Sequence, residues 1–143
     1  MTTSERVGVD VVSVADVEAD VARWGETFLA RVLTENEIGW CRRTFPSVRR
    51  VAACLAVKEA AIKVLGGRPA GFTWQQLEVA TTRRRGPGAL RSLADEVRTA
   101  TGGSPMRTVR CRSRAMGGSA ELWAAWGLDG TARRVVAVGV LGG

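Results

Sequence analysis

Residues 47–67, SVRRVAACLAVKEAAIKVLGG, predict one long helix around which the rest of the fold is built. Ser47 stands at a favourable start, and Gly66-Gly67 provides the glycine stop that commonly ends a helix. Small and apolar side chains fill most positions between these ends. Around Glu59 and Lys63, where Ala56, Ala60 and Ile62 lie, the helix is therefore expected to be largely covered by other elements.

Shorter patterns precede this helix. Residues 7–12, VGVDVV, are typical of a buried strand that carries one carboxylate, Asp10. Residues 15–32 place apolar side chains at helical spacing and predict one helix. Thr34 and Glu37 form a capping box, which predicts a short helix directly after it.

Further patterns follow the long helix. They predict one helix and four strands, at residues 89–100 and at residues 77–82, 106–112, 120–126 and 134–141. Asp129-Gly130 predicts a hairpin between the last two strands. The sequence therefore predicts an α+β fold, with a long helix on a mainly antiparallel sheet, as a single domain over residues 1–143.

The composition excludes several classes of protein and of chemistry. With 45% hydrophobic and 24% charged residues, the chain is expected to be globular. No apolar run is long enough for a membrane span or a signal peptide, so a cytoplasmic protein without a membrane partner is expected. The three cysteines are too few and too widely spaced for a disulfide framework or a four-ligand zinc site. The absence of histidine excludes Ser-His-Asp and Cys-His catalysis.

The charge is unevenly distributed. The net charge is +7, yet residues 1–43 hold eight acidic and five basic residues, so the excess of arginine lies in residues 44–143. A basic chain attracts an anion: nucleic acid, a phosphorylated small molecule or an acidic protein. Of the 21 basic residues only Lys58 and Lys63 are lysines, and both lie in the long helix. Because a lysine proton can be moved and an arginine proton cannot, this segment is a candidate site of chemistry.

Two carboxylates are candidates for this site. Glu59 and Lys63 are four residues apart and share a helix face, where the simplest interpretation is an exposed ion pair. Asp10 could face solvent or cap a helix, but an unpaired carboxylate among valines and glycines is costly. If Asp10 and Glu59 meet, a cation between them would remove their repulsion. Two hard carboxylates with phosphate oxygens and water describe a Mg²⁺ site.

Three segments in this order resemble one known family. They are VGVDVV (residues 7–12), FLARVLTENE (residues 28–37) and LAVKEAAIKVLG (residues 55–66). Together they resemble holo-[acyl-carrier-protein] synthase, the small class of 4′-phosphopantetheinyl transferases. The resemblance implies the α+β fold of that family. Relative to a minimal member of the family, the strand at residues 134–141 is expected to be an extra C-terminal strand.

The resemblance also implies a reaction. The serine hydroxyl of an acidic acyl carrier protein attacks the β-phosphate of coenzyme A, with Mg²⁺, in fatty-acid or polyketide biosynthesis. Asp10 and Glu59 would hold Mg²⁺. Glu59, directly or through a metal-bound water, would take the serine proton, and Lys63 would neutralise or protonate the departing phosphate. The family implies a homotrimer. The candidate residues for binding coenzyme A are Arg49, Arg50, Lys58, Gly66 and Arg114.

The chain departs from the family at three places. Ala53-Cys54-Leu55 replaces the family's Gly-Arg-aromatic run. The family's late Ser-His pair corresponds either to Ser113-Arg114, which we favour because a helix precedes that strand, or to Leu128-Asp129. The first helix begins with acidic residues where relatives carry arginines. Two alternatives to catalysis are a relative that binds coenzyme A or a carrier protein without transfer, and a basic nucleic-acid-binding domain.

Overall fold

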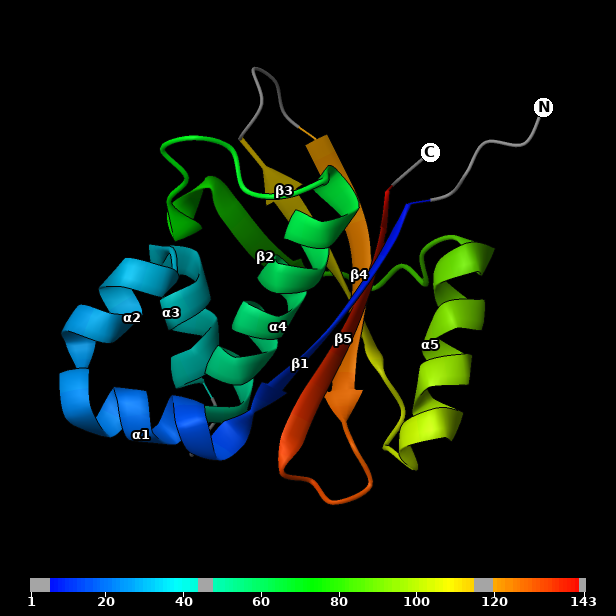
Figure 1. The fold of residues 1–143 in the computed structure, drawn as a ribbon, viewed down its shortest axis with the longest axis horizontal. Helices are drawn as coiled ribbons and strands as arrows, with labels where there is room; N and C mark the ends of the chain where they lie inside the picture. Colours follow the sequence, from blue (N-terminus) through cyan, green and yellow to red (C-terminus); the bar gives the residue numbers. More distant parts are fainter. Residues whose placement is uncertain (1–5, 44–47, 115–119, 142–143) are drawn as a thin grey trace.

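The computed structural model describes residues 6–43, 48–114 and 120–141, which form one sheet with helices on both faces (Figure 1). The five strands are β1 (Val7–Ser13), β2 (Leu77–Thr81), β3 (Arg107–Ser113), β4 (Ala120–Leu128) and β5 (Arg134–Leu141). Every neighbouring pair is antiparallel, in the order β1-β5-β4-β3-β2. The predicted α+β fold is confirmed. The C-terminal strand lies inside the sheet, between β1 and β4, and β1 forms an edge.

The helices divide between the two faces of the sheet. They are α1 (Val14–Trp24), α2 (Glu26–Val32), α3 (Glu35–Arg42), α4 (Val48–Leu65), the short η1 (Trp74–Gln76) and α5 (Gly88–Thr101). Figure 1 shows α1 to α4 on one side of the sheet and α5 on the other. The predicted start of α4 at Ser47 lies outside the described residues. None of the described helices is long and apolar enough to cross a membrane.

The single helix predicted over residues 15–32 is wrong, because Gly25 divides it into α1 and α2. Gly25 has a φ of +53°, a conformation that glycine adopts more readily than other residues, and its N–H donates to the Val21 carbonyl at the end of α1. The capping box before α3 is confirmed. The Thr34 side chain accepts from the Glu37 N–H, and the Glu37 side chain accepts from the Thr34 N–H.

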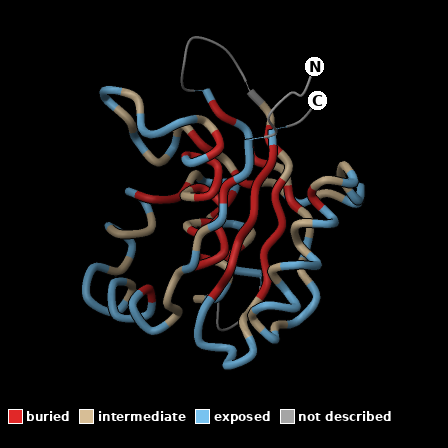
Figure 2. Tube along the Cα trace, turned by 45° about the vertical axis from the view of Figure 1, so that its right-hand side comes forward, coloured by how far each residue is buried: buried red, intermediate tan, exposed pale blue. Residues whose placement is uncertain are grey.

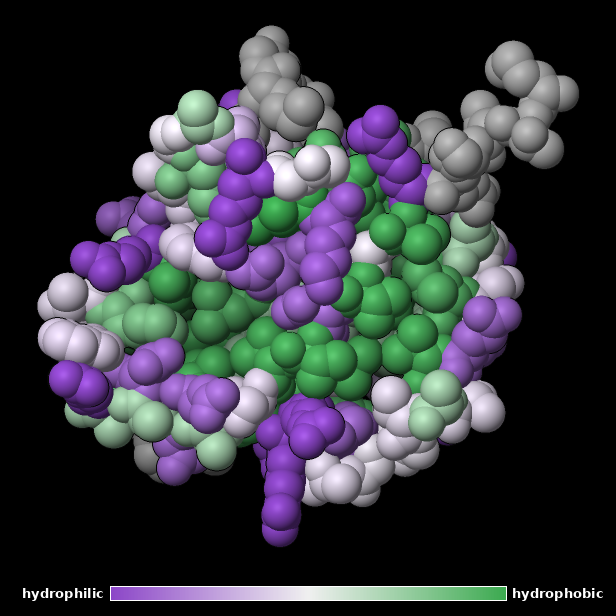
Figure 3. All heavy atoms as spheres, viewed as in Figure 1, coloured by the Kyte–Doolittle hydropathy of each residue, from purple (hydrophilic) through white to green (hydrophobic). Residues whose placement is uncertain are grey.

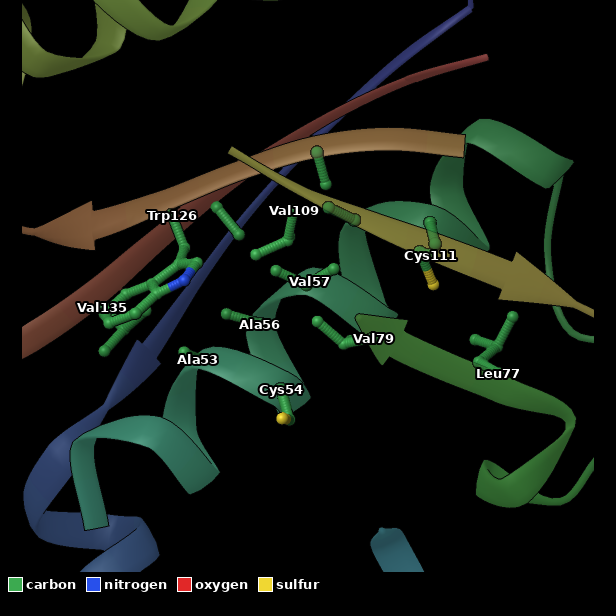
Figure 4. Close-up of a cluster of buried hydrophobic side chains, with 14 of the residues drawn as sticks. Ala53, Cys54, Ala56, Val57, Leu77, Val79, Val109, Cys111, Trp126 and Val135 are labelled. Carbon is green, nitrogen blue, oxygen red and sulfur yellow. The ribbon is translucent and has the colours of Figure 1, made fainter. Parts of the chain in front are cut away.

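Helix α4 supplies much of the core. Its buried side chains pack on the sheet, most extensively against β1 and β5, and the close-up in Figure 4 shows Ala53, Ala56 and Val57 among the core side chains of the strands. Figure 2 shows buried residues concentrated in this layer and along the central strands. Gly8 of β1 lets α4 approach the edge of the sheet. A Cβ at Gly8 would lie 2.2 Å from the Ala60 carbonyl oxygen, so a side chain there would push the two elements apart.

A buried ion pair ties α4 to α3. Lys58 and Glu37 are fully enclosed, with Nζ 2.7 Å from Oε1. The Lys58 ammonium also donates to the carbonyls of Val32 and Trp74, at 2.8 and 3.1 Å. The other Glu37 oxygen accepts from the Val79 N–H of β2 at 2.7 Å. One ion pair therefore fixes the relative positions of α2, α3, α4 and β2.

The three cysteines are free and buried in this core. Burial raises the pKa of the Cys111 thiol from 9.0 to about 12. The pKa of the Cys54 thiol is also raised, mainly by a hydrogen bond with Cys41 and secondly by burial. These thiols therefore behave as apolar core groups at neutral pH.

Cys111 is expected to make the fold sensitive to alkali. Its pKa is raised on folding, so its stabilising contribution is complete below pH 9.0 and is lost as the pH rises towards about 12. Urea unfolding between pH 8 and pH 11 should show a falling free energy of unfolding, with a shallower fall in Cys111→Ala. Equal slopes in the two proteins would show that Cys111 is not the cause.

Candidate active site

Asp10 and Lys63 meet at the surface where β1 lies against α4. The Lys63 ammonium donates to Asp10 Oδ1 at 3.1 Å and to the Val9 carbonyl at 2.7 Å. The Asp10 side chain is 19% exposed and the Lys63 side chain is 52% exposed, so both are accessible to a ligand. The close approach at Gly8 makes this contact possible, because a longer distance between α4 and β1 would separate the two groups.

Glu59 lies one helical turn before Lys63 on α4, at a Cβ separation of about 6 Å. Its Oε1 accepts from Nη2 of Arg68 at 2.6 Å. The exposed Glu59–Lys63 pair suggested by the spacing does not form, since each residue pairs with a different partner. The structure thus pairs Asp10 with Lys63, and it places Glu59 one helical turn from Lys63, paired with Arg68 as a fourth charged group.

Arg68 was missed by the sequence analysis. Its guanidinium lies over the rings of Phe72 and Trp74, 5.7 and 5.0 Å from their centroids. The only available signal was an arginine directly after Gly66-Gly67. The Gly67 N–H donates to the Ile62 carbonyl, which reverses the chain and returns Arg68 towards Glu59.

Asp10 and Glu59 are the two residues of this site that could hold a divalent cation. Asp10 and Glu59 offer hard carboxylate oxygens, and each uses one oxygen for the protein cation beside it. Within the described ranges no group of three acidic, cysteine or histidine side chains could hold a metal. Oxygens of water and substrate would therefore complete the coordination of Mg²⁺, which commonly keeps such ligands.

These groups form a hydrophilic area on the molecule. In the space-filling view of Figure 3, hydrophilic side chains gather over α4, and a hydrophobic surface follows β1 beside them. The alternation of β1 accounts for the contrast. Asp10 points towards α4, whereas Val9 and Val11 point to the opposite face and are exposed.

The prediction that Lys58 binds coenzyme A is wrong. Lys58 is fully buried, and its three N–H groups donate to Val32, Glu37 and Trp74. No donor of this ammonium remains for a phosphate. Local sequence patterns could not indicate this burial, because the partners lie 16 to 26 residues away along the chain.

Arg49 and Arg50 lie at the opposite end of α4 from Glu59 and Lys63. At 1.5 Å per residue the separation along the helix is about 14 to 21 Å. Arg50 also donates to the Trp40 carbonyl and stacks on the Trp40 ring. Within one chain, the structure therefore does not bring these arginines to the two carboxylates.

The two remaining candidates for binding coenzyme A, Gly66 and Arg114, each lie directly after a helix or a strand. Gly66 follows the last residue of α4 with a φ of +91°, and its N–H donates to the Lys63 carbonyl, so it lies beside the site. Arg114 is exposed after β3, and its N–H donates to the Gln76 carbonyl. The contacts described for residues 6–43, 48–114 and 120–141 do not join Arg114 to Asp10, Glu59 or Lys63.

Arg49 and Arg50 instead line a groove of about 1190 Å³ between the start of α1, the start of α4 and the β4–β5 turn. We call this the arginine groove. Its basic residues are Arg49, Arg50, Arg107, Arg133 and Arg134, and its acidic residue is Glu18. Within the described part of the chain, none of these five arginines forms an ion pair with a carboxylate. The groove therefore carries uncompensated positive charge.

Holo-[acyl-carrier-protein] synthases are among the known proteins that this chain resembles. A holo-[acyl-carrier-protein] synthase of Koribacter versatilis is 41% identical over 73 residues, which cover 50% of this chain and 58% of that protein. Its counterpart in Herpetosiphon aurantiacus is 37% identical over 102 residues, which cover 63% and 78%. The matched segment thus spans little more than half of the Koribacter protein.

Solved structures share the fold. The crystal structure of the Neisseria meningitidis synthase has a TM-score of 0.57 at 20% identity, covering 96% of this chain and 97% of that one. The Helicobacter pylori synthase, solved in complex with coenzyme A, has a TM-score of 0.54 at 21% identity, covering 94% and 98%. The model of the 4′-phosphopantetheinyl transferase superfamily matches residues 6–105, which include Asp10, Glu59 and Lys63. The chain therefore belongs to the 4′-phosphopantetheinyl transferase superfamily.

Proposed function

We propose that this protein transfers the 4′-phosphopantetheine arm of coenzyme A to a serine of an acyl carrier protein. The observation that carries the proposal is the contact between Lys63 and Asp10 beside Glu59, in a chain of this superfamily. The carboxylates of Asp10 and Glu59 and the flexible ammonium of Lys63, close to one surface, suit phosphoryl transfer. That reaction depends on positioning and on neutralisation of charge more than on covalent catalysis by the protein.

Each side chain has a role in this proposal. Asp10 and Glu59 would hold Mg²⁺, which supplies neutralisation of the diphosphate charge when it is bound. Glu59 accepts the proton of the serine hydroxyl as the serine oxygen bonds to the β-phosphorus. The bond from that phosphorus to the bridging oxygen breaks, and adenosine 3′,5′-bisphosphate leaves. Lys63 donates to the departing phosphate and stabilises its added charge. None of these steps uses histidine, which the chain lacks.

The release of adenosine 3′,5′-bisphosphate tests this reaction. The protein, coenzyme A and Mg²⁺ are incubated with an apo bacterial acyl carrier protein, and the nucleotide is measured by chromatography. We expect release that requires the carrier, stops with a chelator and fails when the carrier serine is replaced by alanine. Binding of coenzyme A without release, on several carriers, would instead favour a relative that does not catalyse transfer.

An acidic carrier in the cytoplasm suits the charge of this protein. At +7, the chain attracts acidic partners at long range, and the arginine groove concentrates this charge in one concave surface. Helix α1 begins with Asp16, Glu18 and Asp20, of which only Glu18 lines the groove. We infer that the acidic surface of a fatty-acid or polyketide carrier protein docks at the arginine groove.

Charge reversal in this groove should weaken carrier binding. Arg133→Glu with Arg134→Glu is expected to raise the KM for the carrier about tenfold, with little change in the KM for coenzyme A. Arg83→Glu with Arg85→Glu makes the same change of net charge on an exposed loop outside the groove and is the control. Equal effects of the two double variants would show that net charge, and not the groove, attracts the carrier.

The family resemblance also predicts a homotrimer, and β1 offers a surface for assembly. Val7, Val9 and Val11 share one face of this edge strand and are 50%, 37% and 50% exposed. Light scattering is expected to give three times the chain mass of 15.3 kDa, and Val9→Asp should lower it. A mass of one chain for the unmodified protein at micromolar concentration would contradict the trimer.

A further inference from the structure

Arg68 occupies an unusual position for a surface arginine, because three groups hold it at once. Its guanidinium bonds Glu59 at 2.6 Å and lies over both Phe72 and Trp74. The two rings themselves pack edge to face, with centroids 5.5 Å apart. The arginine side chain is 50% exposed, so it is held by contacts and not by enclosure.

The four charged groups of the site balance one another. Asp10 is paired with Lys63 and Glu59 with Arg68, so two negative charges face two positive charges. A site whose net charge is zero contributes little electrostatic free energy to the binding of a divalent cation. To bind both carboxylates it must compete with the cation that already contacts each of them.

From this geometry we propose that Arg68 is an internal counter-ion that competes with the divalent cation for Glu59 and couples cation binding to coenzyme A binding. The proposal rests on the role of Glu59 as a metal ligand in the proposed function. With a cation held by Glu59, Arg68 would be free to contact the diphosphate of coenzyme A. Phe72 and Trp74 keep the released guanidinium near the site, since a cation–π contact persists without the carboxylate.

Arg68 is a positioning residue in this scheme, and its effect is on binding before any reaction occurs. Removing its charge leaves Glu59 without a competitor, so the site should bind a divalent cation more tightly in the absence of coenzyme A. The same change removes the guanidinium that would contact the diphosphate of coenzyme A. The increase in cation affinity caused by coenzyme A should therefore become smaller, because coupling between two ligands is reciprocal.

Titration with Mn²⁺, followed by the loss of the free Mn²⁺ signal in electron paramagnetic resonance, measures both quantities without turnover. Arg68→Gln is expected to bind Mn²⁺ alone about tenfold more tightly than the unmodified protein, which is the effect of one partly exposed ion pair with ring contacts. Coenzyme A should strengthen Mn²⁺ binding less in this variant. Arg68→Lys keeps the charge and should remain close to the unmodified protein.

Two further variants make the test specific. Arg42→Gln removes the same charge from the exposed Arg42–Glu26 pair and should leave Mn²⁺ binding unchanged. Glu59→Gln should abolish the site. Unchanged Mn²⁺ affinity in Arg68→Gln, with binding lost in Glu59→Gln, would overturn the inference on Arg68 alone. No Mn²⁺ binding by any protein, with or without coenzyme A, would overturn the inference and the metal-dependent function together.

Discussion

Replacing Glu59 with glutamine is expected to lower kcat for phosphopantetheine transfer about a thousandfold, the effect of removing a general base. Glutamine keeps the size of the side chain and an oxygen for Arg68, but it cannot take the serine proton and is a poorer ligand for a divalent cation. The Glu59 side chain is 29% exposed, so the fold should tolerate the change. The rate is measured as release of adenosine 3′,5′-bisphosphate, and folding as the thermal midpoint.

Glu96→Gln is the matched control for this variant. Glu96 lies exposed on α5, on the opposite side of the sheet from α4, and the same change of charge there should leave kcat unaltered. A Glu59→Gln protein that retains more than a few per cent of the kcat would show that Glu59 is not the base.

Replacing Lys58 with methionine is expected to reduce the free energy of unfolding by about 3–5 kcal/mol, because it leaves the buried carboxylate of Glu37 without its counter-charge. Methionine fills a similar volume, so the loss would reflect charge and hydrogen bonds more than a cavity. Urea unfolding at pH 7 measures it. A loss below about 1 kcal/mol, the range of an exposed pair, would show that this ion pair is not structural.

Two variants locate the cause of that loss. Lys63→Met makes the same chemical change at an ammonium that is 52% exposed, and it should cost less than about 1 kcal/mol. Adding Glu37→Leu to Lys58→Met removes the isolated carboxylate. The double variant should therefore lose less stability than the sum of the two single variants.

The two lysines now have separate explanations. Three acceptors converge on Lys58 Nζ, which suits a compact ammonium with three N–H groups and not the planar fork of arginine. Lys63 lies at the surface, where its flexible side chain and transferable proton suit the proposed role of stabilising the departing phosphate. The concentration of lysine in α4 thus reflects one structural and one functional requirement.

Local patterns predicted the elements well. The valine-rich run around Asp10, the capping box at Thr34 and the glycine stop at Gly66 each act within a few residues, and each appears in the structure. The place of β5 between β1 and β4 was not predictable from its own residues, because pairing depends on distant strands. The division of the first helix at Gly25 was missed, since the apolar spacing continues through it.

The site was predicted less completely than the fold. Asp10, Glu59 and Lys63 were selected from a motif, and the structure pairs Asp10 with Lys63 one helical turn from Glu59. Lys58 was selected as a candidate for binding the 3′-phosphate of coenzyme A, and only the folded chain reveals that its partners enclose it. Arg68 was missed because its contact with Glu59 depends on how α4 ends. Pairing between charges is set by three-dimensional packing, which spacing along the sequence does not specify.

The most direct test of the central claim is the intact mass of an apo acyl carrier protein after incubation with this protein, coenzyme A and Mg²⁺. We predict a gain equal to one phosphopantetheine arm, absent with chelator and absent with Glu59→Gln. An unchanged mass on several carriers, from a folded protein that binds coenzyme A, would contradict the assignment of a transferase.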